Sequence, residues 1–360
     1  MKLLFYPKGA RSGRPNDGGD TSLISGAHLF DTIGGTPACR EVAQAFYARV
    51  DRDPLLRPLF PGTTLRCAIE AFAAFLVQFL GGPGEDSQKR WWLSLRESHR
   101  RFRIDWRHRD AWMHCMVEAL EDAGIAEPAR GALRSFFEQA SAYAIDSATD
   151  GPPMTPELAR RWDGQRALDE AVDAIRKGEA DRAIELAGMC GRTVLPGLLA
   201  LMVASGNRGL IVYVHERLTG DPALVHERYA GRTMLHNAAS AGSLATVELL
   251  LRLGADPNAL DGGRHTPLYS VGNECQGAES GDVVRALVRG GAQVDAHDGV
   301  TRATALHMAA RRGNAVAAKA LLDCGADRTA RDRRGDTPLQ RALNCKKLRV
   351  AELLRSSEGV

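Results

Sequence analysis

Long apolar runs, paired cysteines and a strong excess of charge of either sign are all missing from this chain of 360 residues. The longest apolar run before Pro7 has only four residues, too few for a signal peptide, and no later run is long enough to span a bilayer. The seven cysteines occur singly, which indicates free thiols in a reducing compartment. A net charge of +3 favours no polyanionic partner. We therefore expect a soluble cytoplasmic protein that binds neither nucleic acid nor a membrane.

The local signatures of the common enzyme classes are absent as well. The sequence has no H-E-x-x-H or paired-cysteine metal motif, no G-x-S-x-G elbow, no phosphate loop and no G-x-G-x-x-G fingerprint. These absences argue against those classes and leave open whether the chain is an enzyme. Any functional signal must come from how residues are arranged over longer distances.

Proline divides the chain into two parts that both have helical periodicity. Residues 147–163 contain three prolines and a glycine within a few positions, which predicts a linker. Before it, residues 27–146 show amphipathic helical patterns without a competing strand pattern, so we expect an all-α domain. Thr36 is the expected cap of its first long helix. Residues 8–26 are rich in Gly, Arg, Ser and Asp and have little to bury, so we expect residues 1–26 to form a disordered extension.

The second part, residues 164–360, is repetitive. Threonines at 233, 266, 304 and 337 are spaced 33, 38 and 33 apart and begin T-x-L-H-x-A or T-P-L patterns, which precede L-L and G-A-D in the more regular units. This pattern resembles the ankyrin repeat, and two degenerate units upstream bring the expected number to about six. The threonines can cap helices. The resemblance implies that His236 and His307 tie neighbouring turns together, and that the solenoid binds a protein partner.

One histidine stands out in the first part. His99 lies in "SLRESHRRFRI", residues 94–104, among four arginines and several apolar residues. Taken alone, this histidine fits a surface position, a packed core, a catalytic base or a metal ligand. The aromatic residues spaced along the neighbouring helices likewise suit either a core or a cofactor pocket.

The arrangement of several blocks resembles the second group of the truncated haemoglobins, over residues 29–146. These blocks are "LFDTIGGTP", "AFYARVDRDPLLRPLFP", "FLVQFLGGP", "LRESHRRFRI" and "RDAWMHCM". The resemblance implies a 2-on-2 helical sandwich that holds haem b, with His99 as the proximal ligand of the iron. An imidazole is a suitable axial donor, and its second ring nitrogen normally binds a nearby carbonyl. Tyr47 and Trp112 then supply distal hydrogen bonds to dioxygen or another diatomic ligand.

The same resemblance implies roles for further cofactor-binding residues. Phe60 wedges the haem, Phe72 and Phe75 fill the distal wall, and Ala68 occupies the position of the distal histidine of many globins. Leu95 packs beneath His99, Phe102 walls the pocket, and Met116 faces inward. Arg103, and more weakly Arg100, suit either a haem propionate or a solvated surface. The sequence departs from the family at Arg100 and Arg101 and at Trp91 and Trp92.

Together these features predict an all-α protein with a truncated globin followed by an α-solenoid of ankyrin repeats. We expect a globin that reversibly binds diatomic ligands and that docks on a protein partner through its repeats. Haem-based sensing and redox detoxification are possible extensions of this role. The alternative is an ankyrin interaction scaffold whose globin part has lost its haem.

Overall fold

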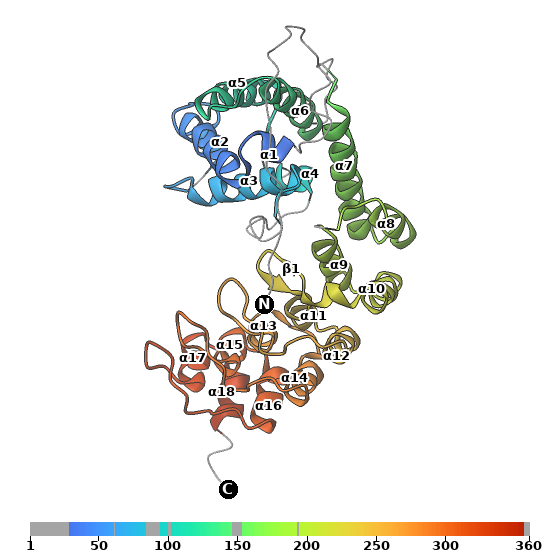
Figure 1. Cartoon of the computed structure of the whole chain (residues 1–360). Coiled ribbons are helices and arrows are strands. Elements are labelled where there is room, and N and C mark those ends of the chain that lie inside the picture. The colour runs from blue at the N-terminus through green and yellow to red at the C-terminus, as the bar shows by residue number, and fades with distance from the viewer. Residues whose placement is uncertain are drawn as a thin grey trace, which may run out of the picture.

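The computed structural model describes residues 29–60, 62–83, 94–99, 102–145, 153–192 and 194–355. The expected N-terminal extension lies outside these residues, as do Trp91, Trp92, Arg100 and Arg101. Almost all regular structure in the described part is helical, and its two strands, β1 (Arg228–Tyr229) and β2 (Arg232–Thr233), form one short antiparallel pair. Figure 1 shows the globin above the stacked repeats. The predicted fold class, a globin followed by ankyrin repeats, is confirmed.

The described residues of the globin form six helices and one short 3-10 turn. In chain order they are α1 (Leu29–Thr32), α2 (Gly35–Val50), η1 (Arg57–Leu59), α3 (Arg66–Phe79), α4 (Leu95–His99), α5 (Trp106–Asp122) and α6 (Ala129–Ala144). Helix α2 packs on both α3 and α5, and α5 packs on α6. Phe46, Met116 and Phe136 are completely buried where these helices meet. The core therefore sits between two layers of helices.

The start of α2 differs from the sequence prediction. Thr36 was expected to cap this helix, but α2 begins at Gly35, and Gly34 is its N-cap residue. Both glycines have positive φ, 105° at Gly34 and 70° at Gly35, a region that residues with a Cβ atom rarely occupy. They turn the chain directly from α1 into α2, so Thr36 lies inside the first helical turn. The prediction that Thr36 is the cap is therefore wrong.

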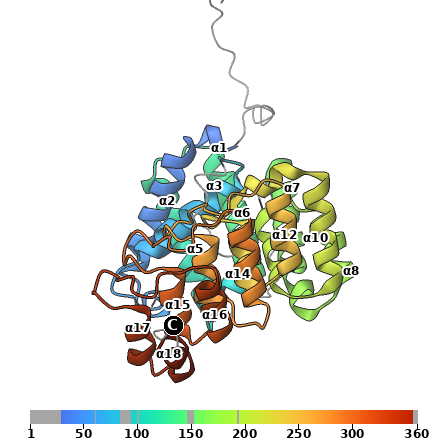
Figure 2. The same ribbon diagram turned by 90° about the horizontal axis from the view of Figure 1, so that it is seen from below.

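The second part is a stack of helix pairs. The pairs are α7 (Pro156–Lys177) with α8 (Ala180–Ala187), α9 (Leu195–Ala204) with α10 (Arg208–Gly220), α11 (Met234–Ala241) with α12 (Leu244–Arg252), α13 (Pro267–Glu274) with α14 (Ser280–Arg289), α15 (Ala305–Arg312) with α16 (Ala315–Asp323), and α17 (Pro338–Asn344) with α18 (Leu348–Arg355). A 3-10 turn, η3 (Pro222–His226), precedes β1. First helices contact first helices and second helices contact second helices. Figure 2 shows α10, α12, α14 and α16 following one another along one side of the stack.

The repeat threonines and histidines hold this stack together as predicted. Thr304 is the N-cap of α15, where its hydroxyl accepts from the His307 backbone N–H. His236 Nε2 lies 3.0 Å from the His265 carbonyl, and His307 Nε2 lies 3.0 Å from that of Asp336. Since a carbonyl only accepts, Nε2 carries the proton in both rings. Burial lowers the pKa of His236 and His307, which keeps both rings neutral.

Helix α7 belongs to both parts of the molecule. Thr155 caps it, Pro156 occupies its first turn, and Gly178 ends it in the left-handed conformation. Leu158 and Trp162 pack in the globin core, whereas Leu168 and Val172 pack in the core of the repeats. The last part of the expected linker, residues 156–163, is therefore the beginning of a helix that connects two cores. None of the helices in the described residues combines the length and apolar character needed to cross a membrane.

Candidate functional site

The globin encloses a cavity of about 670 Å³. This volume is in the range of small-molecule and cofactor pockets. Its walls are mostly apolar and come from α2, α3, α4, α5 and α6, together with the segments around η1 and before α5. His99, Tyr47 and Trp112 all line it, so the structure brings the three principal predicted residues to one cavity.

His99 is the last residue of the short helix α4. Its Nδ1 lies 2.8 Å from the Leu95 carbonyl oxygen and 3.0 Å from the Ser98 hydroxyl. Because the carbonyl can only accept, Nδ1 carries the ring proton, and in the neutral ring the lone pair is on Nε2. The hydrogen bond expected at the second ring nitrogen is thus present. It fixes the tautomer that a metal-ligating histidine requires.

Tyr47 and Trp112 come from α2 and α5, and both pack against Phe46. The Phe46 ring centroid is 5.0 Å from that of Tyr47 and 5.1 Å from that of Trp112. Phe60 meets Tyr47 edge-on, with ring centroids 5.5 Å apart. Aromatic packing of this kind holds each ring in one orientation. The phenol and the indole are therefore placed on rigid helices beside the cavity.

The structure separates the remaining predicted residues into two sets. Six of them line the cavity, namely Phe60, Ala68, Phe72, Phe75, Leu95 and Phe102. Arg103 and Met116 are not among its lining residues. Arg103 is exposed in the segment between α4 and α5. Met116 lies one turn beyond Trp112 on α5, where it is completely buried in the helix core.

Among the polar residues of the cavity wall that sequence reasoning missed are His108 and Arg109 at the start of α5. The Arg109 guanidinium donates to the Ser141 hydroxyl at 3.2 Å and to the Glu138 carbonyl at 3.3 Å, both on α6. Arg109 precedes Trp112 by three residues, so the two share a helix face. That spacing was the signal in the sequence that would have identified it.

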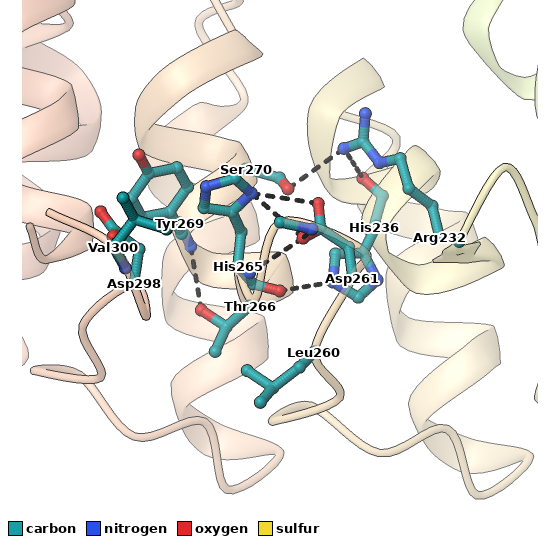
Figure 3. A network of polar contacts seen from close by, with 12 residues as sticks. Arg232, His236, Leu260, Asp261, His265, Thr266, Tyr269, Ser270, Asp298 and Val300 are labelled. Carbon is teal, nitrogen blue, oxygen red and sulfur yellow. Dashed lines mark hydrogen bonds and ion pairs between the residues drawn. The ribbon is translucent and has the colours of Figure 1, made fainter. Parts of the chain in front are cut away.

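The repeats carry a second candidate site, at the loops that connect them. His236 on α11 ties the next loop in place through the His265 carbonyl, and the His265 ring stacks on Tyr269 with centroids 4.3 Å apart. Figure 3 shows this network beside Leu260 and Val300. Leu260 and Val300 are 39% and 63% exposed, so apolar side chains project from otherwise polar, hydrogen-bonded loops. Both side chains are exposed and therefore accessible to another molecule.

Known protein families match both parts of the chain. The model described as bacterial-like globin matches residues 28–145, and two ankyrin-repeat models match residues 218–268 and 275–360. Group 2 truncated hemoglobin YjbI of Bacillus subtilis (strain 168) is 33% identical over 103 residues, which cover 29% of this chain and 74% of that protein. The chain belongs to the truncated haemoglobin family.

This truncated haemoglobin differs from that relative by its repeats. Hemoglobin from the thermophilic phototrophic bacterium Chloroflexus aurantiacus, a solved structure, is 39% identical and covers 33% of this chain and 98% of its own, with a TM-score of 0.32. Ankyrin repeat and SOCS box protein 11 of Danio rerio is 42% identical over 105 residues, 29% of this chain. This chain spans only about a third of the ankyrin relative, 34% of its length.

Proposed function

We propose that this truncated haemoglobin holds haem b through His99 and reversibly binds dioxygen or a related diatomic ligand, while its repeats bind a protein partner. One observation carries the proposal. His99 Nδ1 donates to the Leu95 carbonyl, which places the lone pair of the neutral ring on Nε2, and His99 lines one cavity together with Tyr47 and Trp112. The matches to globin and ankyrin families support the two roles at the level of the family.

The residues around the cavity fit a haem. A volume of about 670 Å³ is large enough for a cofactor, and phenylalanines from α3 and α6 supply an apolar wall for a flat macrocycle. When bound, haem would supply an iron that His99 could ligate and that could take up a diatomic ligand. Arginine suits the carboxylates of the propionates. Arg109, which lines the cavity, is better placed for them than the exposed Arg103.

The chain's own donors explain how a ligand would be retained. The Tyr47 hydroxyl and the Trp112 indole N–H can each donate a hydrogen bond, whereas Ala68 cannot. In an apolar pocket such bonds are stronger than in water, which slows the escape of a polar ligand. Ala68 also leaves more room at the cavity wall than a histidine would.

The seven cysteines are free thiols in the structure, which supports our proposal of a reducing, cytoplasmic location.

An absorption spectrum of the full chain tests the proposal. The protein is purified, reconstituted with haem and measured in ferric, ferrous and carbon monoxide forms. We expect a Soret band that His99→Ala weakens or abolishes. The matched control is His114→Ala, since the His114 side chain is 74% exposed on α5 and its loss should leave the band unchanged. A wild-type chain without a Soret band would instead favour the alternative, an ankyrin scaffold that no longer binds haem.

A further inference from the structure

Helix α4, which carries His99, is too short to be stable by itself. It has five residues, and isolated helices of this length are unstable in water. Its first amides need acceptors from outside the helix. The acceptors come from Asp169 on α7, a residue 74 positions further along the chain. The proximal helix of the globin is therefore capped by a side chain from the helix that the globin shares with the repeats.

The Asp169 carboxylate is well ordered by its surroundings. Its Oδ1 accepts from the Leu95 N–H at 2.8 Å, and its Oδ2 accepts from the Arg96 N–H at 3.1 Å. Gln165, one turn earlier on α7, donates its amide to Oδ1 at 2.7 Å. Asp169 is only 4% exposed. Two backbone donors and one side-chain donor satisfy this buried carboxylate, and a negative group suits the N-terminal end of a helix.

These hydrogen bonds connect Asp169 to His99 through a single peptide group. The Arg96 N–H that donates to Asp169 and the Leu95 carbonyl that accepts from His99 Nδ1 belong to the same peptide unit. An acceptor at the N–H end of an amide polarises it and makes its carbonyl a better acceptor. A stronger acceptor draws the Nδ1 proton further from the ring and makes Nε2 a better donor to a metal.

Other contacts keep α7 against the globin at this point. Arg161 donates to the Phe79 carbonyl at 3.2 Å, and Trp162 packs edge-on against Tyr143, with ring centroids 5.2 Å apart. The Arg96 guanidinium lies over the Tyr143 ring, 3.9 Å from its centroid. Burial raises the pKa of Tyr143 to about 12, and the nearby Asp169 carboxylate adds to this rise. The position of Asp169 thus depends on how α7 packs against the globin.

We propose that Asp169 is a positioning residue for His99, which acts through the Leu95–Arg96 peptide group to orient the imidazole and strengthen it as an iron ligand. This inference rests on the proposed function, because it concerns the same haem site. Since α7 continues into the core of the repeats, any movement of the repeats that shifts α7 changes His99 as a ligand. By thermodynamic linkage, a change of ligand at the haem changes how α7 packs against the globin.

The test compares Asp169→Asn with Asp173→Asn in the full chain. Both variants remove one carboxylate from α7, but the Asp173 side chain is 54% exposed and pairs with Lys177 on the next turn. In the haem-free proteins, NMR-detected amide exchange at Leu95 and Arg96 should be about tenfold faster in Asp169→Asn, the size expected for a lost charged hydrogen bond. In the ferrous haem form, the iron–histidine stretching band should move to lower frequency. Asp173→Asn should change neither.

Each outcome decides the inference. Faster exchange with an unmoved stretching band would show that Asp169 is only a helix cap and overturn its action on His99. Unchanged exchange would overturn the capping itself. If Asp169→Asn does not fold, Gln165→Leu gives the same readouts, because it removes the amide that holds Oδ1 but keeps the carboxylate. A wild-type chain that takes up no haem overturns the proposed function, whereas a haem-binding chain with an insensitive band overturns this inference alone.

Discussion

Replacing Trp162 by alanine should weaken the globin far more than the repeats, although Trp162 lies in the expected linker and outside the predicted globin domain. Its side chain is 5% exposed and packs against Phe136 and Tyr143, with ring centroids 5.8 and 5.2 Å away. A buried tryptophan covers roughly 150–250 Å², and its truncation to alanine costs about 3–5 kcal/mol. For a domain of this size that loss lowers the melting temperature by roughly 10–20 °C. The repeats lose no contact of comparable size.

The cysteines allow each part of the molecule to be followed separately. Cys39 is buried in the globin and Cys275 in the repeats, whereas Cys67 is exposed and serves as an internal standard. Pulsed alkylation along a temperature ramp, read by peptide mass spectrometry, gives a midpoint for each buried thiol. In Trp162→Ala the midpoint temperature for Cys39 alkylation should fall by roughly 10–20 °C. The midpoint temperature for Cys275 should change by only a few degrees.

Trp106→Ala is the matched control, since Trp106 is 62% exposed on α5 and surface substitutions usually change stability by about 0.5 kcal/mol or less. Equal Cys39 midpoints in the two variants would refute the reasoning. They would mean that α7 does not complete the globin core.

Three further predictions concern the pocket and the repeats. Tyr47→Phe removes one donor worth about 0.5–1.5 kcal/mol, so flash photolysis should show dioxygen release about 2- to 10-fold faster; an unchanged rate would assign retention to other groups. Gly272→Ala places a Cβ atom 2.4 Å from the Ala305 carbonyl oxygen. In urea titrations this substitution should lower the free energy of unfolding of the repeats by about 1–3 kcal/mol, and an unchanged value would contradict the close packing. Burial lowers the pKa of His236 and His307, so unfolded histidines take up protons first as pH falls below about 6.5. The free energy of unfolding should therefore be highest above that pH and decline below it. The double variant His236→Gln/His307→Gln should show a smaller decline between urea titrations at pH 7.5 and pH 5.5.

The repeats could be predicted from the sequence because their determinants are local. A threonine, the residue three positions later and the intervening turn form a complete cap, so each unit carries its own signature; at α17, Gln340 takes the place of the histidine. The start of helix α7 has the same Thr-Pro signature in the sequence. Thr155 and Pro156 start α7 as Thr266 and Pro267 start α13. The third proline of the expected linker therefore begins a helix, because proline fits a first turn.

The family resemblance predicted pocket residues by their positions on the faces of helices, and it did so correctly where such a face borders the cavity. Tyr47, Trp112 and His99 meet at the cavity for this reason, and Met116 does not, since one turn along α5 the same face is packed against the core. The assignment to the second group of the family stays a prediction. Asp169 could not be found in this way, because its partner amides are far away in sequence and no local pattern joins them.

The shared helix also has a consequence for the order of events when the chain is made. A ribosome releases the globin segment first, and N-terminal domains generally begin to fold during synthesis. Here the globin lacks Trp162 and the cap of α4 until α7 has emerged, and α7 completes its other face only when the following helices are available. The final packing around His99 therefore has to wait for residues encoded after the globin. Newly made chains should acquire a competent pocket only once translation has passed well into the first repeats.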